Sequence, residues 1–247
     1  MAEPVSVVIP TYNRYPLVRE SIDSALAQPE VHEVIVVDDA SMDGTVERLT
    51  RDYDGCERLR MLRQPENRDK SAARNRGLAA ATTPFIMFLD SDDVLESGAV
   101  GALLEVMLRC EGEEDVVVYG PCRVHDRIEI PFCELPGGKV LSEYIRRPFL
   151  HTPSFLAPVR LLSEVGGYRE DLSNMEDVEL FLRLMCRARF FPVDHVVFTI
   201  RKQADATSSN YARILQQGRR LFEYIRGNED LMRELSGDDR CLLESRI

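Results

Sequence analysis

The chain has 247 residues, with 31 basic and 42 acidic side chains and a formal net charge of −11 at pH 7. This excess of negative charge argues against general binding to nucleic acid or to an anionic membrane surface, because either polyanion would repel the protein. The length allows one large domain or two small ones, with a substantial hydrophobic core.

Cysteine usage and hydropathy predict a soluble protein of the cytoplasm. The six cysteines have no CxxC spacing, so we expect unpaired, buried thiols, as in a reducing compartment. The first ten residues, MAEPVSVVIP, lack the basic start and the long apolar run of a signal peptide. No segment approaches the roughly 18 apolar residues of a membrane span. Peripheral association with a membrane stays compatible with the sequence.

The first half of the chain alternates predicted strands and helices. Continuous apolar runs predict strands at residues 5–9, 34–37, 58–62, 85–89 and 116–119. Amphipathic or alanine-rich segments predict helices at residues 17–26, 46–49, 69–81 and 100–108. Strands without polar alternation, separated by helices, are typical of a parallel sheet covered on both faces. The expected fold class is α/β, with a Rossmann-like, mostly parallel central sheet.

Polar loops follow these strands, and we expect them to meet at one edge of the sheet. Right-handed crossovers place the strand-to-helix loops at the carboxyl edge, where ligands bind in open α/β sheets. Three of these loops read PTYNR, DDASMDG and DSDDV. We interpret Asp43 and Thr45 in the second loop as turn and cap residues. The convergence of three polar, acid-rich loops indicates a ligand site.

The second half of the chain has a looser pattern. Residues 120–140 predict irregular strands with a Pro-Gly-Gly turn, and residues 154–156 and 193–200 predict further strands. A clear helix is expected at residues 174–188. One or two charged helices should follow residue 208, with breaks at GNED and SGDD.

Three carboxylates end the predicted strand at residues 85–89, in the stretch FLDSDDV. Asp90, Asp92 and Asp93 would repel one another, and their desolvation is costly unless a cation lies among them. A bound metal ion would remove this repulsion. The structural alternative is a capped turn before a helix at residue 96, and for Asp93 a role in solvent or in capping is equally open.

Six segments, taken in chain order, resemble family 2 glycosyltransferases of the GT-A fold: VSVVIPTYNR, VVDDASMDGT, SAARNRG, FLDSDD, GGYRED and MEDVELFLRL. The resemblance covers residues 4–200 and is specific for the family but not for the substrate. It implies a GT-A domain at residues 1–205, with a nucleotide-sugar-binding half (1–120) and an acceptor-side half (121–205). Residues 206–247 would be a C-terminal helical extension.

The implied activity is transfer of a sugar from a nucleotide-diphosphate sugar to an acceptor hydroxyl, usually with inversion. The acceptor would be a saccharide, a lipid-linked molecule or another hydroxyl compound, in polysaccharide or glycoconjugate synthesis of the bacterial type. The resemblance also implies a divalent cation at a D-x-D motif, with Asp92 as direct ligand and Asp90 contacting the ribose, the metal or both. Mn²⁺ or Mg²⁺ would hold the diphosphate and stabilise the leaving group in this acidic chain.

The same resemblance implies a nucleotide site. Asp39 would accept the N3–H of uracil or thymine, which favours UDP or dTDP donors. Arg74 would lie near the base or the phosphates, with an ordinary helix-surface position as the alternative. Asp38 would either stabilise a turn or contact the ligand. The other implied residues, which would line or approach the base, are Pro10, Thr11, Tyr12, Asn13 and Arg14.

A general base is expected in the segment SNMEDVELFLRLM. Asp177 shares a helical face with apolar residues, whereas Glu176 shares a face with Glu179 and Arg183 that reads as solvated. Ser173 and Glu176 also fit a capping box, which gives Glu176 a structural role. A carboxylate at a helix N-terminus is favoured in its ionised form. Asp177 is therefore the predicted base, in agreement with the family motif.

One position departs from the family pattern. Relatives often carry an R-x-H segment after the last strand, but this chain has Gln203 at that place. Arg201, Lys202 or residues 207–209 are the alternative contacts to the diphosphate. His151 is expected on the acceptor side, with a structural role as its alternative.

Two rival functions fit parts of the sequence. FLDSDDV also fits the D-x-D-x-[TV] pattern of haloacid-dehalogenase-type phosphatases, but in those enzymes the motif ends the first strand. A non-catalytic nucleotide-sugar-binding protein is the second alternative, supported by the changed histidine position alone.

Overall fold

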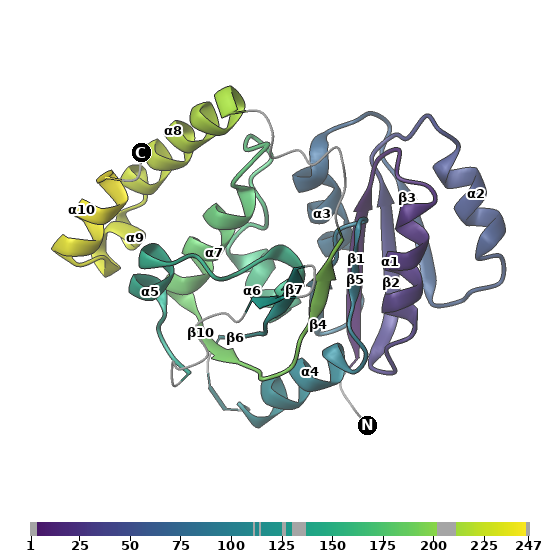
Figure 1. The fold of residues 1–247 in the computed structure, drawn as a ribbon, viewed down its shortest axis with the longest axis horizontal. Helices are drawn as coiled ribbons and strands as arrows, with labels where there is room; N and C mark the ends of the chain where they lie inside the picture. Colours follow the sequence, from purple (N-terminus) through teal and green to yellow (C-terminus); the bar gives the residue numbers. More distant parts are fainter. Residues whose placement is uncertain are drawn as a thin grey trace.

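The computed structural model describes residues 4–110, 112–113, 115–124, 127–129, 137–201 and 211–245. A seven-stranded sheet, in the order β10-β6-β9-β4-β1-β2-β3, forms its centre (Figure 1). Its strands are β1 (Val5–Thr11), β2 (Val31–Asp38), β3 (Leu59–Arg63), β4 (Phe85–Phe88), β6 (Val116–Tyr119), β9 (Phe155–Pro158) and β10 (Arg189–Pro192). β1 pairs in parallel with β2 and β4, and β9 runs antiparallel between β4 and β6. The expected mostly parallel sheet is confirmed.

Helices cover both faces of this sheet. Val7 and Ile9 pack on one face with α1 (Leu17–Leu26), α2 (Thr45–Asp52) and α4 (Ala99–Arg109). Val8, between them in the chain, packs on the other face with α3 (Asp69–Ala80), α6 (Val159–Glu164) and α7 (Glu176–Arg187). Since successive side chains of a strand point to opposite faces, a strand buried on both faces becomes a continuous apolar run.

A second, four-stranded sheet has the order β5-β11-β7-β8. Its strands are β5 (Asp93–Leu95), β7 (Cys122–Val124), β8 (Arg127–Glu129) and β11 (Phe198–Ile200). The strand expected at residues 193–200 forms only at its end, because the chain changes sheets there. β10 pairs with β6 in the large sheet, whereas β11 pairs with β7 and β5 in the small one.

The C-terminal segment forms three helices instead of one or two, because both predicted breaks interrupt it. These are α8 (Tyr211–Gly227), α9 (Glu229–Glu234) and α10 (Gly237–Ser245). They lie at the opposite end of the molecule from α1 and α2 (Figure 1). Leu221 and Ile225 of α8 belong to the same hydrophobic cluster as α7. Two short elements complete the described fold: α5 (Leu141–Arg146) and the 3₁₀ helix η1 (Thr152–Ser154).

Within the described ranges, no helix has both the length and the apolar character needed to cross a membrane. Five cysteines are free thiols, as expected, but only Cys122 is buried and Cys241 is exposed. Cys133 lies outside the described residues.

Candidate active site

The loops after β1 and β2 are joined at the carboxyl edge of the large sheet. The backbone N–H of Asp39 donates to the carbonyl of Thr11 at 2.8 Å. The N–H of Asn13 donates to Ser41 Oγ at 2.8 Å, and the N–H of Met42 donates to Asn13 Oδ1 at 2.8 Å. Asn13 has a φ of 50°, in the left-handed region that asparagine tolerates. The expected convergence of these loops is confirmed.

The proposed nucleotide-binding residues of the first loop differ in exposure. Pro10 is buried and Thr11 is 3% exposed, whereas Asn13 and Tyr12, the latter 39% exposed, are accessible to a ligand. The hydroxyl of Thr11 is buried and has no hydrogen-bond partner among the described residues.

Asp39 is held in place by the segment that enters α3. Its Oδ1 accepts from the backbone N–H of Arg68 at 2.9 Å and from Gln64 Nε2 at 3.2 Å. Burial raises the pKa of this carboxyl above its ordinary value, although both hydrogen bonds oppose the shift. The carboxylate is thus oriented in a dry position, where a hydrogen-bond donor from a ligand would gain most.

Two other aspartates of the loop after β2, Asp38 and Asp43, have local structural roles. Asp38 Oδ2 accepts from the backbone N–H of Ser41 at 3.0 Å, which is the turn-stabilising contact, while its buried Oδ1 has no partner among the described residues. Asp43 Oδ1 accepts from the backbone N–H of Thr45 at 3.0 Å, at the start of α2. The turn role expected for Asp43 is confirmed, but the N-cap of α2 is Gly44, without a side-chain cap, and Thr45 is the first residue of the helix.

The acidic loop after β4 carries three carboxylates in different surroundings. Asp90 follows β4, and burial would raise its pKa, but Arg74 and Lys70 lower it overall. Burial and the charge of Asp90 raise the pKa of Asp92. The same causes, with the charge of Asp92 added, raise the pKa of Asp93 to about 8.

Asp93 is neither solvated nor a helix cap. Its side chain is 7% exposed, and its Oδ1 accepts from the backbone N–H of Arg201 at 3.3 Å. It lies in β5, and the next helix begins at Ala99 instead of residue 96. Both alternatives foreseen for Asp93 are therefore wrong, because the residue pairs with β11 in the small sheet.

Arg74 connects the acidic loop to α7. Its guanidinium donates to Asp90 Oδ1 at 2.6 Å and to Glu176 Oε1 at 2.8 Å, and it lies 5.0 Å from the centre of the Tyr168 ring. Only 1% of Arg74 is exposed, which excludes the helix-surface alternative. Planar arginine is suited to such double pairing with carboxylates.

Glu176 does not lie on a solvated face. It is 1% exposed, and Lys70 Nζ reaches the same Oε1 at 2.6 Å. Glu179 is also buried, because Arg183 pairs with its carboxylate at 2.5 Å. The solvated-face expectation is wrong, since paired charges can be buried where isolated ones cannot.

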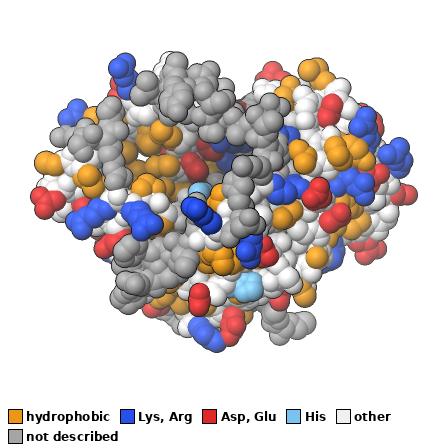
Figure 2. Space-filling view, in the orientation of Figure 1, with side chains coloured by type: hydrophobic (Ala, Val, Ile, Leu, Met, Phe, Trp, Pro, Cys, Tyr) orange, Lys and Arg blue, Asp and Glu red, His pale blue; other side chains and the backbone are white. Residues whose placement is uncertain are grey.

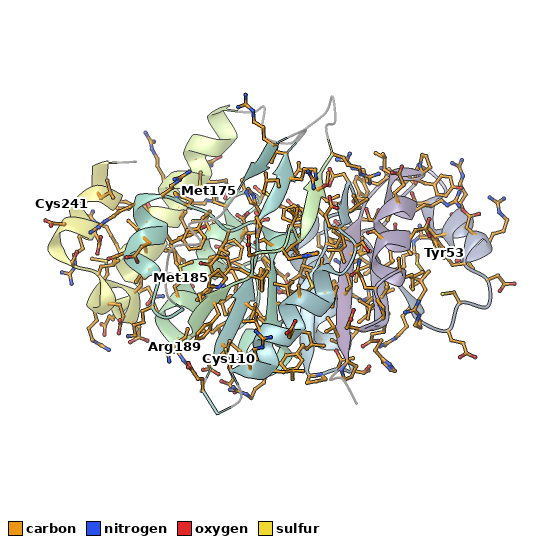
Figure 3. All side chains as sticks on the ribbon, turned by 60° about the horizontal axis from the view of Figure 1, so that its bottom comes forward. Tyr53, Cys110, Met175, Met185, Arg189 and Cys241 are labelled. Carbon is orange, nitrogen blue, oxygen red and sulfur yellow. The ribbon has the colours of Figure 1, made fainter. Side chains whose placement is uncertain are left out.

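The expected capping box is also absent. The residue that precedes α7 is Met175, with a φ of 64° and no side-chain cap. Asp177, the next residue but one, is half-buried and accepts from the backbone N–H of Val178 at 2.8 Å. Burial and the charge of Glu176 raise the pKa of Asp177, while Lys70 and Arg74 oppose this effect. Figure 3 labels Met175 and Met185, near the two ends of α7, among packed side chains.

His151 lies near enough to the acidic loop to contribute, after Arg74 and Lys70, to the lowered pKa of Asp90. Its backbone N–H donates to Ser154 Oγ at 3.1 Å in η1, so a structural contact is present as well. On the face drawn in Figure 2, acidic, basic and histidine side chains are exposed near a hollow in the middle of the molecule.

Arg201 connects the acidic loop with α1. Its Nε donates to the carbonyl of Asp92 at 2.7 Å, and its guanidinium pairs with Glu20 at 2.5 Å. The other residues foreseen near the diphosphate, Lys202, Gln203 and residues 207–209, lie outside the described residues.

The carboxylates present fit a hard divalent cation in part. In the described part of the chain, no three His, Cys, Asp or Glu side chains form a ready metal cage. Mg²⁺ is commonly bound by one or two carboxylates, with water and substrate phosphate completing the shell. Asp90 and Asp92 would supply two such carboxylates. Because Arg74 already takes Oδ1 of Asp90, the other oxygen of that carboxylate is the one open to further ligands.

Sequence reasoning missed several members of this site. Lys70 was not foreseen, although it stands four residues before Arg74 on one face of a predicted helix. Gln64 and Arg68, which orient Asp39, carry no readable signal, because a backbone N–H and a single amide make the contacts. Tyr168 lies in the GGYRED segment, where its ring could have been considered as a partner for a buried cation.

Comparisons with known proteins identify the family of the chain. A family model described as "Glycosyl transferase family 2" matches residues 6–129, about half of the chain. The "Succinoglycan biosynthesis protein ExoU" of Rhizobium meliloti is 39% identical over 206 residues, which cover 77% of this chain and 59% of that protein. The chain thus spans less than two thirds of this relative.

Solved structures are similar in fold at lower sequence identity. The S. aureus TarS 1–349 structure in complex with UDP-GlcNAc has a TM-score of 0.75 and 20% identity, and the match covers 97% of this chain and 70% of that one. The mannosyltransferase PcManGT from Pyrobaculum calidifontis, in complex with GDP-Man and Mn²⁺, has a TM-score of 0.71 and 22% identity, covering 100% and 69%. These likenesses concern the fold alone. With the family match and the sheet order described above, the chain belongs to glycosyltransferase family 2 and has the GT-A fold.

Proposed function

We propose that this protein transfers a sugar from a UDP or dTDP sugar to an acceptor hydroxyl, with inversion and with a divalent metal ion. One observation carries the proposal. The buried Arg74 joins Asp90, at the expected metal site, to Glu176, the residue beside Asp177. Arg74 is 1% exposed and is hydrogen-bonded to both carboxylates. It therefore holds the acidic loop on the donor side in a fixed position relative to the start of α7, where the expected base lies.

Asp90 and Asp92 would hold the metal, Mn²⁺ or Mg²⁺, by carboxylate oxygen. When bound, the metal would supply positive charge to the diphosphate and favour its departure. Burial and the charge of Asp90 raise the pKa of Asp92, although Arg14 and Arg201 oppose this effect, so a bound cation would favour the ionised carboxylate. A cation-dependent affinity for nucleotide diphosphates is the expected consequence.

Asp39 would bind the base by accepting the imide N–H, with the ring of Tyr12 beside it. A carboxylate fixed by Gln64 and the Arg68 backbone suits an N–H donor but not a carbonyl oxygen. The imide N–H of uracil or thymine is such a donor, which supports UDP or dTDP as the nucleotide. The loop contacts between Asn13, Ser41 and Met42 would keep the two sides of the base site together.

Asp177 would take the proton from the acceptor hydroxyl. Its carboxylate is half-buried at the start of α7, and one oxygen is oriented by the Val178 N–H. Burial and the charge of Glu176 raise the pKa of Asp177, in the direction that brings a carboxylate base closer to neutral pH. Attack by the acceptor oxygen on the face opposite the diphosphate would invert the anomeric carbon.

The Rhizobium meliloti relative is named a succinoglycan biosynthesis protein, which supports a role in polysaccharide or glycoconjugate assembly. A nucleotide-sugar donor and free thiols favour the cytoplasm as location. We also propose that residues 1–120 bind the donor, residues 121–205 bind the acceptor and residues 206–247 form an extension. The phosphatase alternative is left without support, since its motif would have to end the first strand, and Asp90 follows β4.

The test is a binding screen that needs no acceptor. UDP, dTDP, GDP and CMP are titrated into the protein by calorimetry, once with Mn²⁺ and once with EDTA. We expect UDP or dTDP to bind best and Mn²⁺ to raise the affinity at least tenfold. Asp92→Asn should remove most of the Mn²⁺ effect, whereas Asp54→Asn, a change of an exposed aspartate, should leave it intact. Equal affinity with Mn²⁺ and EDTA would overturn the metal assignment, and tighter binding of GDP would overturn the base assignment.

A further inference from the structure

Lys70 connects the start of α3 with the start of α7. Its ammonium lies 2.6 Å from Glu176 Oε1, across 106 residues of chain. The lysine side chain is 40% exposed, whereas the glutamate side chain is 1% exposed. A solvent-accessible cation therefore neutralises a carboxylate that water does not reach.

Lys70 supplies the second positive charge that the buried carboxylates of this group require. Arg74 donates to Glu176 and also to Asp90, at 2.8 and 2.6 Å. One guanidinium cannot balance two carboxylates, so Glu176 would keep an unmatched buried charge without Lys70. With Lys70, two cations face two carboxylates. Burial would raise the pKa of Glu176, but Arg74 and Lys70 together lower it.

Asp177 is adjacent to this balanced group. The charged and titratable groups that act on it come from α3, α5, α7 and the loop before α7: Lys70, Arg74, Tyr144, Tyr168 and Glu176. Two of these carry positive charge and one carries negative charge. The two tyrosines are buried, and their pKa values are raised by burial, so they stay neutral. Loss of Lys70 would leave Asp177 next to an excess of negative charge.

We propose that Lys70 is a positioning residue, which balances the buried charge of Glu176 and thereby keeps Asp177 ionised and ready to accept a proton. This inference rests on the proposed function, because it concerns the proposed base. It differs from a direct role in substrate binding, in which Lys70 would contact the diphosphate or an anionic sugar.

The experiment measures the titration of Asp177 itself, without acceptor or turnover. Protein labelled with carbon-13 at the aspartate side-chain carboxyl is titrated by NMR, and the Asp177 signal is assigned by its absence in Asp177→Asn. The variants are Lys70→Met, Lys70→Gln and Lys70→Arg. The control is Lys139→Met, because Lys139 is 67% exposed and pairs with Glu234 at the surface. UDP affinity in Mn²⁺ is measured for each.

We expect the midpoint of the Asp177 titration to rise by roughly 0.5 pH units or more in Lys70→Met and Lys70→Gln, because a nearby positive charge favours the ionised carboxylate. Lys70→Arg should restore the wild-type midpoint, and Lys139→Met should not change it. An unchanged midpoint in both neutral variants would overturn the inference. A large loss of UDP affinity with an unchanged midpoint would assign Lys70 to the donor instead. Failure of the proposed function would appear separately, as a fully active Asp177→Asn.

Discussion

Replacing Glu176 by glutamine removes one negative charge from the buried network and changes the side-chain size little. In the protein, Glu176 Oε1 accepts from Arg74 at 2.8 Å and from Lys70 at 2.6 Å, and the residue is 1% exposed. Glu176→Gln leaves both cations without this carboxylate. If the residue were a surface cap, as its sequence suggested, the change would cost about 1 kcal/mol or less.

The magnitude follows from burial. Removing one partner of a buried ion pair costs about 3–5 kcal/mol, because the other charge stays buried and unmatched. Here the cost falls at the lower end. The glutamine oxygen still accepts one hydrogen bond, Arg74 keeps Asp90, and Lys70 is 40% exposed and can turn to solvent. We expect a loss of about 3 kcal/mol in the free energy of unfolding, or a fall of roughly 6–12 °C in Tm for a chain of this length.

Urea denaturation followed by circular dichroism and a thermal scan at pH 7 measure this loss. The matched control is Glu164→Gln, because Glu164 pairs with Arg160 at 2.9 Å on the surface, where both side chains are more than 40% exposed. That change should cost about 0–1 kcal/mol. If Glu176→Gln were as mild as the control, the buried network would not stabilise the start of α7, and the reasoning would be refuted.

Three further predictions concern donor binding, catalysis and pH. Asp39→Asn should weaken UDP binding at least tenfold both in Mn²⁺ and in EDTA, by calorimetry, and unchanged affinity would contradict the base site. Asp177→Asn should leave UDP affinity within about twofold and lower turnover by roughly a hundred- to ten-thousandfold; a turnover equal to that of wild type would exclude Asp177 as the base. Glu33 accepts hydrogen bonds from Ser6, Thr82 and Arg60, and although burial opposes them, these contacts lower its pKa from 4.5 to about 2. Its folded pKa is depressed, so its stabilisation is present above pH 4.5 and lost as pH falls through about 2. Glu33→Gln should therefore cost about 2–3 kcal/mol at pH 7 and little near pH 2, in urea titrations at both values; a cost independent of pH would exclude this origin.

The sheet and its carboxyl-edge loops were predictable because their signals are local. Val7, Val8 and Ile9 are all fully buried, so the strand required apolar residues at every position. The Asp39 and Asp90 loops follow such strands directly, and parallel topology then brings them to one edge. The helices expected at residues 69–81, from alanine-rich composition, and at residues 174–188, from periodicity, correspond to α3 and α7.

The faces of α7 could not be predicted from its own residues. The pattern of Glu176, Glu179 and Arg183 is that of a solvated stripe, and an isolated helix would expose it. The cations that allow Glu176 to be buried are Lys70 and Arg74, which are more than a hundred residues away in the chain. Burial of charge depends on partners brought by tertiary structure, and local periodicity contains no information about them.

The strand at residues 193–200 was predicted too long for a related reason. Its apolar residues suit a strand throughout, but the chain leaves β6 after Pro192 and joins β7 at Phe198. Hydrophobic pattern identifies buried residues, whereas the choice between two sheets depends on which neighbour has free backbone groups.

The measurement that tests the central claim most directly is the configuration of the first sugar released from the donor. UDP-glucose, UDP-galactose and UDP-N-acetylglucosamine, all α-linked, are incubated with the protein and Mn²⁺, and the anomeric signals are followed by proton NMR before mutarotation. We predict that the accepted donor releases the β-anomer first, that EDTA stops the reaction, and that Asp177→Asn slows it by at least a hundredfold. Initial release of the α-anomer, or an undiminished rate in EDTA, would contradict metal-dependent transfer with inversion.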